Sequence, residues 1–392
     1  MILRDAVPTQ LYNDRGIHFV FPGFFIIFVS IMNLSEENIS SLKRLLEDET
    51  KHNVVIVSHT NPDGDALGSS LALRAMFTHC GHKATCIVPN KFPYFLDDLC
   101  GVQEIVTFKT REEEAVQAVA EADVVVCADI NTLSRLENLS NVIRENTTAV
   151  RVLVDHHLSP DQGFDIVFSH PESSSTAFLV YQIIERIFGT EFIDKEIAEQ
   201  IYVGMMTDTG NFSFSALTPE LYRALAVLAE TGIDIPAIYS KVYNSFTEGR
   251  ARLFGYVINR KMKSLRKGTV AYMTLTEEEM RRFWFRQGDS EGFVNYPLTI
   301  KKMKMSAIFI ESTEYIRISF RSRGDVDVDG FARRYFNGGG HRNAAGGKSF
   351  VSMEETVAKF VTAVEEFAAA GGLSKFYKFR DKAPEAKNEQ PE

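Results

Sequence analysis

Cysteine is scarce in this chain of 392 residues, and no cysteine stands in a Cys-x-x-Cys arrangement. The four cysteines are Cys80, Cys86, Cys100 and Cys127, and Cys127 lies inside an apolar run. This usage argues against a disulfide scaffold. We therefore expect a reduced, cytoplasmic protein whose fold depends on a hydrophobic core.

The chain also has no excess of basic residues, and its formal net charge is -9. An acidic balance argues against a surface that coats long nucleic acid, so we expect no binding of long DNA. A partner that carries phosphate should therefore be small, and held by a few basic residues or by metal. The length and the 45% of hydrophobic residues indicate a soluble globular protein of about two domains.

The chain lacks an uninterrupted apolar run of membrane-spanning length. Residues 18–32 are apolar and aromatic, but they are short for a span and a Pro-Gly pair interrupts them. They also lack the small-residue cleavage site of a secretory signal. We expect translation to start at Met32, before a helix capped by Ser35, which makes residues 1–31 a doubtful extension. Membrane contact is expected only if residues 18–32 are a real segment.

Strand-like and helix-like patterns alternate through the first part of the chain. Apolar strand runs are expected at 54–57, 84–88, 124–128 and 151–154, and helices at 67–80, 112–122, 174–188, 195–206 and 219–230. This alternation predicts an α/β fold with a parallel sheet and helices on both faces. We place this domain at 32–231, followed by a partly helical connector at 232–250.

The pattern changes in the last third of the chain, which predicts a second, smaller α/β domain at 251–375. Its expected elements are strands at 269–275, 305–310 and 315–320, a Gly-rich stretch at 336–347 and a helix at 353–369. Residues 376–392 are charged and rich in Lys, Glu and Pro, so we expect a disordered tail.

Carboxylates and imidazoles gather where the predicted strands of the first domain end. They are His59, Asp63 and Asp65 after the first strand run, Asp129 after 124–128, Asp155, His156 and His157 after 151–154, and Asp208 just past a helix. Each stretch alone is compatible with a solvated surface turn. In a parallel sheet, however, the carboxyl ends of the strands meet at one edge, where ligands bind.

Carboxylates brought together in this way would repel one another, and bound divalent cations remove the conflict. Mixed imidazole and carboxylate ligands suit Mn²⁺ best, with Mg²⁺, Co²⁺ or Zn²⁺ as alternatives. The ligands exceed what one ion needs. Two ions about 3.5–4 Å apart, bridged by one carboxylate, form the arrangement used in phosphoester hydrolysis.

A second set of residues in the later domain suits an anion. Gly338, Gly339 and Gly340 have no side chains that would block close approach, and their amides could form a phosphate-binding nest beside His341. Arg321, at the end of a predicted strand, offers a guanidinium suited to bidentate phosphate contact. The alternatives are a Gly-rich turn that merely packs closely and a solvated surface arginine.

These stretches resemble the motifs of the DHH phosphoesterases that carry a DHHA1 domain. The matching segments, in order, are SHTNPDGDALG, VCADI, VLVDHH, GMMTDTGNF and FNGGGHRNAAGG. The resemblance spans about residues 50–350, and in size and layout the chain is similar to the NrnA-type oligoribonucleases. It implies Mn²⁺ dependence and a two-domain clamp around the substrate.

The resemblance also implies a role for each site residue. One ion would be held by His59, Asp63 and Asp129, and the other by Asp65, Asp129, His156 and Asp208. Asp129 would bridge the two ions, and Asp155 would ligate a metal or orient a ligand. His157 would lie near the leaving group or the phosphate, while Arg321 and His341 would anchor substrate phosphate.

The implied function is hydrolysis of short oligoribonucleotides to mononucleotides, with 3′-dephosphorylation of 3′-phosphoadenosine 5′-phosphate (pAp) as a second activity. Hydrolysis of cyclic or linear dinucleotides is the enzymatic alternative, and a nucleotide-binding protein is the non-enzymatic one. An inorganic pyrophosphatase of the same superfamily is disfavoured, because it lacks the Gly-Gly-Gly-His stretch. The sequence leaves open whether the protein forms a homodimer.

Overall fold

The computed structural model describes residues 9–13, 16–20, 34–213 and 217–373 and divides into two compact units. Unit 1 ends at Ile238 and unit 2 begins at Tyr239, except that the short segment Phe92–Phe95 belongs to unit 2. The predicted start at Met32 and the predicted tail lie outside the described residues, as does the predicted apolar segment beyond Val20.

Unit 1 contains a six-stranded sheet in which every strand pair is parallel. Its strands, in spatial order, are β5 (Val106–Thr107), β4 (Lys83–Val88), β3 (Asn53–Val57), β6 (Val124–Ala128), β7 (Val150–Asp155) and β8 (Ile166–Ser169). The central strands are continuous apolar runs because both faces of the sheet are buried. Upstream, β1 (Thr9–Asn13) and β2 (Gly16–Val20) pair as an antiparallel hairpin.

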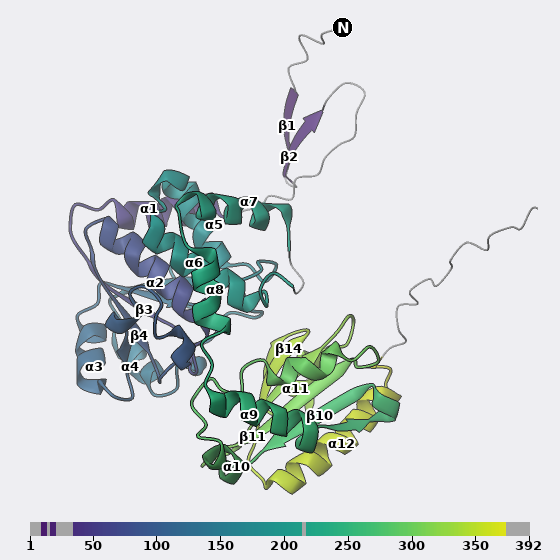
Figure 1. Cartoon of the computed structure of the whole chain (residues 1–392). Helices are drawn as coiled ribbons and strands as arrows, with labels where there is room; N and C mark the ends of the chain where they lie inside the picture. The colour runs from purple at the N-terminus through teal and green to yellow at the C-terminus, as the bar shows by residue number, and fades with distance from the viewer. Residues whose placement is uncertain (1–8, 14–15, 21–33, 214–216, 374–392) are drawn as a thin grey trace, which may run out of the picture. The chain divides into compact units, whose positions relative to one another are not determined.

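Helices cover both faces of this sheet, as predicted (Figure 1). The helices of unit 1 are α1 (Glu36–Leu46), α2 (Gly64–His79), α3 (Glu112–Ala120), α4 (Leu139–Glu145), α5 (Thr176–Phe188), α6 (Lys195–Asp208) and α7 (Pro219–Glu230), and α8 (Ile235–Tyr243) spans the boundary between the two units. The helices α3 and α4 share a buried apolar cluster with one face of the sheet. The short elements β8 and α4 were missed because each offers too few residues for a clear period.

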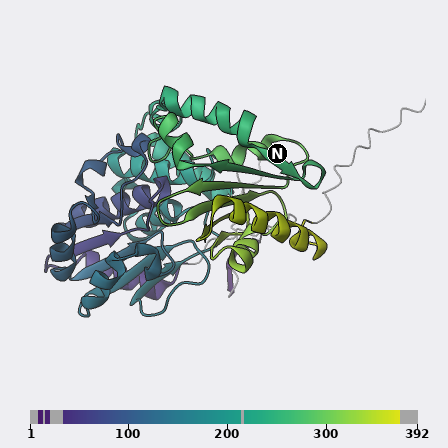
Figure 2. The same cartoon turned by 90° about the horizontal axis from the view of Figure 1, so that it is seen from below.

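Unit 2 contains a second six-stranded sheet of mixed direction. Its order is β13 (Gly339–His341), β14 (Ala344–Ser349), β12 (Ile316–Ser322), β11 (Met305–Glu311), β10 (Val270–Leu275) and β9 (Lys263–Leu265). Only the β10–β11 pair is parallel. The helices of unit 2 are α9 (Glu248–Tyr256), α10 (Glu277–Arg282), α11 (Val328–Tyr335) and α12 (Met353–Ala369), and α12 lies along one face of the sheet (Figures 1 and 2).

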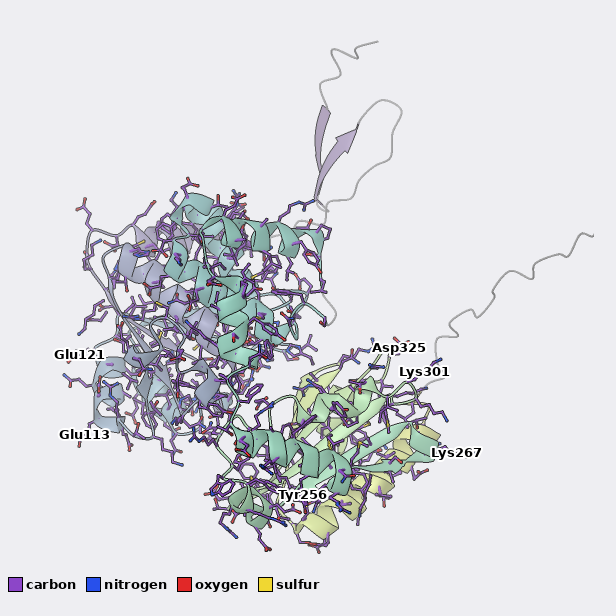
Figure 3. The ribbon with its side chains drawn as sticks, viewed as in Figure 1. Glu113, Glu121, Tyr256, Lys267, Lys301 and Asp325 are labelled. Carbon is purple, nitrogen blue, oxygen red and sulfur yellow. The ribbon has the colours of Figure 1, made fainter. Side chains whose placement is uncertain are left out.

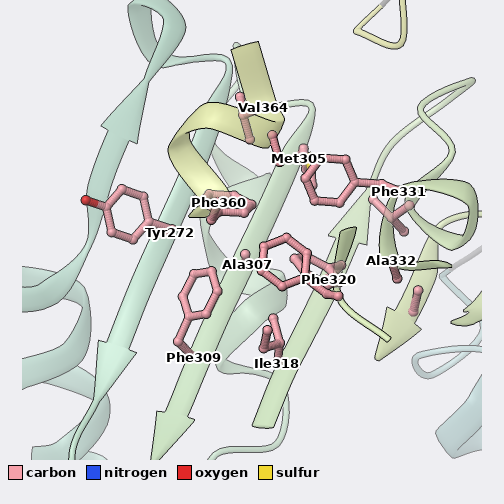
Figure 4. Packing of buried hydrophobic residues seen from close by; sticks show 14 of the residues in the cluster. Tyr272, Met305, Ala307, Phe309, Ile318, Phe320, Phe331, Ala332, Phe360 and Val364 are labelled. Carbon is pink, nitrogen blue, oxygen red and sulfur yellow. The ribbon is translucent and has the colours of Figure 1, made fainter. Parts of the chain in front are cut away.

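Aromatic side chains build the core between this sheet and α12. The ring of Phe360 on α12 packs against Phe309 and Phe320 on the strands (Figure 4). Its centroid is 5.2 Å from that of Phe309 and 6.2 Å from that of Phe320. Phe331 of α11 completes the cluster from the side, 5.5 Å from Phe320. Unit 2 therefore has a hydrophobic core of its own, as expected of a separate domain.

One prediction about an element end was wrong. Asp208 was expected just past its helix, but it is the last residue of α6, because the helix continues for a further half-turn. The Gly-rich stretch, for which no strand was predicted, forms the β13–β14 hairpin, and β14 also pairs with β12. Glycine is unfavourable in strands, and only this pairing with its neighbours makes the stretch extended.

Glycines let the helices that carry the site approach one another closely. A Cβ atom on Gly68 of α2 would lie 2.4 Å from the carbonyl oxygen of Gln200 on α6. A Cβ atom on Gly204 would lie 2.4 Å from the Cβ atom of Ala177 and 2.9 Å from Oδ1 of Asp65. Small residues at both positions are therefore needed to bring α2, α5 and α6 together around Asp65.

We expect Gly204→Ala to lower the free energy of unfolding by about 1–3 kcal/mol, because the added methyl group overpacks this contact. The matched control is Gly255→Ala in α9, where nothing lies within 4 Å of the added atom. Alanine should leave that helix unchanged or stabilise it by up to about 1 kcal/mol. Urea unfolding of both variants measures the difference, and equal effects would contradict the packing account.

Candidate metal centre

The predicted ligands of unit 1 lie at one edge of its sheet. His59 follows β3, Asp129 follows β6 directly, and Asp155 is the last residue of β7. The register pairs Val57 with Cys127 and Ala128 with Val154, so the three strands end side by side. The carboxyl ends of the parallel strands therefore deliver these side chains to a common point.

His59, Asp63 and Asp129 form the first group, with one ligand atom from each lying within 4.8 Å of the others. The Nε2 atom of His59 is 3.3 Å from Oδ2 of Asp129. Its Nδ1 atom is 2.9 Å from the carbonyl oxygen of Thr60, to which it can donate a hydrogen bond. That bond leaves the Nε2 lone pair directed at the carboxylates, as metal-binding histidines require.

Asp65, Asp129 and His156 form the second group, again within 4.8 Å. The Nε2 atom of His156 is 3.8 Å from Oδ2 of Asp65 and 3.6 Å from Oδ1 of Asp129. It is also 3.6 Å from Oδ2 of Asp208, which reaches the group from the last turn of α6. The Nδ1 atom of His156 lies 3.2 Å from the carbonyl oxygen of Ser173, so this imidazole is held in the same way as His59.

Asp129 is common to both groups and is buried, with 2% of its surface exposed. Its backbone φ of 57° is in the left-handed region, which only Gly, Asn and Asp adopt readily. This turn at the end of β6 points the carboxylate back across the sheet edge. The hydroxyl group of Thr176 donates to Oδ1 of Asp129 at 2.9 Å and fixes its orientation.

The N-terminus of α5 holds Asp65. The backbone N–H of Thr176 donates to Oδ2 of Asp65 at 2.7 Å, and that of Ala177 donates to Oδ1 at 2.8 Å. A carboxylate at a helix N-terminus is favoured by the orphan N–H groups and by the helix dipole. Asp63 is the N-cap of α2, since its Oδ1 atom accepts from the N–H groups of Asp65 and Ala66.

The electrostatics of this cluster fit cations. Burial raises the pKa of Asp65 well above its usual range, and the charges of Asp129 and Asp208 raise it further. Burial alone would raise the pKa of Asp129 as well, but the hydrogen bond with His59 and the nearby histidine charges bring it well below its usual value.

The two histidines show the complementary effect. Burial lowers the pKa of His59, but its hydrogen bond to Asp129 and the charge of Asp63 raise it above the usual value. Burial likewise lowers the pKa of His156, and the charges of Asp208 and Asp129 raise it above the usual value. Without cations, protons on these groups offset the repulsion between the carboxylates, and bound divalent cations would take over that role.

Asp155 and His157 lie beside the two groups, and together with Asp129 they form a third group of possible ligands. The Nδ1 atom of His157 is 2.7 Å from Oδ1 of Asp155, and the backbone N–H of His157 donates to Oδ2 at 2.9 Å. Both oxygens of the fully buried Asp155 are therefore engaged by the same residue. This geometry fixes the orientation of the His157 ring.

Sequence reasoning missed the residues that hold these ligands in place. Thr176 contacts both Asp65 and Asp129, and the carbonyl group of Ser173 orients His156. Both belong to the run Ser173-Ser174-Ser175-Thr176, which leads into the first residue of α5. Such a hydroxyl-rich run before an apolar helix indicates an N-cap, and this signal could have drawn attention to it.

In unit 2, Arg321 and His341 lie on the two strands that flank β14. Both are in register with Ala344 of β14, Arg321 from β12 and His341 from β13. Residues directly opposite one another on adjacent strands share a face of the sheet, so the two side chains stand on the same face, about 10 Å apart. Arg321 was expected at the end of a strand and is the penultimate residue of β12.

The glycines beside them pack closely within the hairpin, and the phosphate nest expected from their amides stays a prediction. A Cβ atom on Gly338 would lie 1.9 Å from the carbonyl oxygen of Gly346, so no larger residue fits against β14. The N–H of Gly340 donates to Oδ1 of Asp329 at 2.7 Å, and its φ is 156°. That amide is therefore occupied by a carboxylate. Gly339 pairs with Gly346 in the same hairpin.

Comparison with known protein families assigns a domain family to each unit. Residues 53–205 match the model of the DHH family, N-terminal domain, and residues 267–370 match the model of the DHHA1 domain. The chain belongs to the DHH family. The first match covers β3, β6 and β7 with their ligands, and the second covers most of the sheet of unit 2.

Several known proteins are similar to this DHH protein. The bifunctional oligoribonuclease and PAP phosphatase NrnA of Thermus thermophilus is 27% identical over 82% of this chain and 92% of its own length. The crystal structure of an exopolyphosphatase-related protein from Bacteroides fragilis is 40% identical with a TM-score of 0.81, over 88% of this chain and all of that one. The cyclic-di-AMP phosphodiesterase GdpP of Bacillus subtilis is 25% identical over 84% of this chain, but over only half of its own length.

This DHH protein has no helix, within the residues that the structure describes, that is long and apolar enough to cross a bilayer.

Metal binding should stabilise this DHH protein. We expect Mn²⁺ at about 100 times its dissociation constant to add about 2.7 kcal/mol to the free energy of unfolding, because it binds the folded cluster and not the separated ligands. Differential scanning fluorimetry with Mn²⁺, and with EDTA, measures the change. An unchanged melting temperature with saturating Mn²⁺ would contradict a metal centre at Asp129.

Proposed function

We propose that this protein is a phosphoesterase that hydrolyses short oligoribonucleotides to mononucleotides and also removes the 3′-phosphate of pAp. Residues 32–231 would form the catalytic domain, 232–250 the connector and 251–375 the substrate-binding domain. The observation that carries the proposal is the shared carboxylate of Asp129, which belongs to both groups of candidate ligands. A bridging carboxylate is the feature that two-metal phosphoester hydrolysis requires.

The metal ligands are proposed as two sets around Asp129. His59 and Asp63 complete the first set, and Asp65, His156 and Asp208 complete the second. We propose Mn²⁺ as the ion in both, because mixed imidazole and carboxylate donors suit it, with Mg²⁺ and Co²⁺ as alternatives. Bound divalent cations would supply Lewis-acid charge and an activated water for attack on phosphorus.

The protein's own residues would prepare the substrate for that attack. Asp155 fixes the His157 ring through the 2.7 Å contact to Nδ1, so that Nε2 can contact a phosphoryl oxygen or the leaving oxygen. Arg321 and His341, on one face of the sheet in unit 2, would hold a second phosphate group. Fixing the substrate at two points restricts the scissile bond to an orientation that suits in-line attack.

The choice of short RNA and pAp rests on similarity to NrnA along nearly the whole length of both proteins. The overall charge of -9 supports a short substrate, since long single strands are usually held by extended basic grooves. Hydrolysis of a cyclic dinucleotide is the second candidate, and the similarity to GdpP favours it to a lesser degree because half of that protein has no counterpart here.

The proposal is tested by turnover with Mn²⁺ on a matched panel. The panel contains a 5′-phosphorylated dinucleotide, a five-mer and a 24-mer of RNA, together with pAp, cyclic di-AMP and pyrophosphate. We expect the two short RNAs and pAp to be hydrolysed fastest. Preference for cyclic di-AMP would replace the proposal with the signalling alternative, and binding without turnover of any member would indicate a nucleotide-binding protein.

Arg321→Ala should raise KM for the dinucleotide more than it lowers kcat, because Arg321 is proposed to contact a phosphate remote from the bond that breaks. Loss of one charge-assisted phosphate contact should raise KM about tenfold. The matched control is Arg317→Ala, four positions earlier on the same strand. An unchanged KM in Arg321→Ala would remove Arg321 from the substrate site.

A further inference from the structure

Four chain segments of unit 2 meet at one end of its sheet. A row of backbone hydrogen bonds joins them: the N–H of Lys304 donates to the carbonyl of Thr269 at 2.8 Å, and the N–H of Arg323 donates to the carbonyl of Lys304 at 2.9 Å. The N–H of Ser322 then donates to the carbonyl of Asn343 at 3.0 Å. This sheet end therefore runs continuously from the start of β10, past β11 and β12, to the hairpin that carries His341.

These segments are strongly basic. They are 266–268 (RKG), 299–304 (TIKKMK), 321–323 (RSR) and 341–343 (HRN), and they contain eight lysines and arginines and no acidic residue. Such a concentration is informative in a chain whose net charge is -9. We call this set of segments the basic edge.

The opposite end of the same sheet carries charges of both signs, since Arg281 pairs with Glu277 and Lys261 pairs with Glu279. Figure 3 shows Lys267 and Lys301 at one end of unit 2, where Asp325 also lies, and Tyr256 towards the other. An excess of one sign of charge at one end attracts a ligand of the opposite sign.

A cavity of about 490 Å³ lies at the far end of the basic edge from His341. It is lined by Arg266, Lys267, Thr269, Lys304, Glu365, Ala368 and Leu373. Contacts between lining residues hold two of the long side chains in place. Arg266 pairs with Glu365, and Nζ of Lys304 is 3.5 Å from the carbonyl oxygen of Leu373. Within the described ranges, Lys267 makes no ion pair, so its ammonium group is available to a ligand.

The turn that carries Lys267 has a left-handed backbone. Arg266, Lys267 and Gly268 have φ values of 47°, 56° and 86°, which are all in the left-handed region. That region is unfavourable for long side chains such as those of Arg and Lys. These residues form the turn that joins the antiparallel strands β9 and β10, where left-handed residues are usual. The turn places Lys267 among the residues that line the cavity.

We propose that the basic edge is a track for RNA phosphates, and that the cavity beside Lys267 holds a phosphate of substrates longer than a dinucleotide. The inference rests on the proposed function and adds a determinant of substrate length. Four strand spacings of about 4.8 Å separate β13 from β10, so the track is about 19 Å long. A dinucleotide or pAp held at Arg321 and His341 would not span it, whereas a five-mer would extend towards the cavity.

Binding of a labelled, 5′-phosphorylated five-mer RNA in EDTA, followed by fluorescence anisotropy, tests this without requiring turnover. We expect Lys267→Glu to raise Kd roughly fivefold to tenfold, and Lys267→Ala to lower the slope of log Kd against log salt by about 0.7. The Kd of pAp, measured by competition, should change less than twofold. Arg281→Glu is the control, with the same charge change at the opposite end on a side chain that is 72% exposed.

An unchanged five-mer Kd in Lys267→Glu would overturn the proposal, as would an equal weakening of pAp or an equal effect of Arg281→Glu. Absence of any five-mer binding by the unmodified protein would overturn it as well. A different result would contradict the proposed function and leave the track intact. If the unmodified protein binds the five-mer through Lys267 but does not hydrolyse it with Mn²⁺, the track stands and the enzymatic assignment is wrong.

Discussion

Asp129→Asn is expected to lower kcat at least about a thousandfold with Mn²⁺, for both the dinucleotide and pAp. Asp129 belongs to both groups of candidate ligands, so loss of its charge weakens both metal positions together. Asparagine has the same shape and tolerates the left-handed φ of 57°, so the turn after β6 should be kept. Initial rates and metal content measured on the same preparations give the result.

Asp123→Asn is the matched control for this variant. Asp123 lies just before β6, at the other end of the same strand, and its Oδ2 atom accepts the N–H of Asn53 at 2.7 Å. Its replacement should change stability slightly and leave kcat within about twofold. Near-normal turnover in Asp129→Asn with Mn²⁺ would contradict the bridging role.

The second large effect is expected from Asp155→Asn. The carboxylate accepts both the Nδ1 proton and the backbone N–H of His157, so it selects the tautomer in which Nε2 carries the lone pair. An amide can present its NH₂ group to Nδ1 and stabilise the other tautomer. The same change of the aspartate in a Ser-His-Asp triad costs about 10⁴ in kcat, and we expect about 10²–10⁴ here with little change in KM.

Two further variants make this result specific. Asp165→Asn is the control. The Oδ2 atom of Asp165 accepts a hydrogen bond from the backbone N–H of Arg151 at 2.8 Å, at the end of β7 that is remote from Asp155. The double variant Asp155→Asn/His157→Gln should be no slower than the slower single variant, because the two residues act as one unit. Additive losses would show that Asp155 acts independently of His157, for example as a metal ligand.

Much of unit 1 could be predicted because its central strands are buried on both faces. The runs at 54–57 and 124–128 are continuous apolar stretches, and the structure extends each by no more than one residue. A side chain that follows such a run is placed at the sheet edge by topology alone. The approach of Asp129 to His59 and His156 follows from this rule without any knowledge of loop geometry.

Contacts between distant parts of the chain could not be predicted in the same way. The amide of Thr176 reaches Asp65 across 111 positions, and it does so because α5 packs beside α2 with its N-terminus at the sheet edge. The strand pairing of the Gly-rich stretch was not predicted, for a related reason. Its composition permits an open loop, whereas pairing with β12 and the contact between Gly340 and Asp329 make it a hairpin.

The most direct test of an ion pair bridged by Asp129 is anomalous diffraction at the manganese edge from crystals soaked in Mn²⁺. We predict two peaks about 3.5–4 Å apart, both within coordination distance of the Asp129 carboxylate. One peak should also contact His59 and Asp63, and the other Asp65 and His156. A single peak, or two peaks of which only one touches Asp129, would contradict a carboxylate-bridged pair of ions as the catalytic centre.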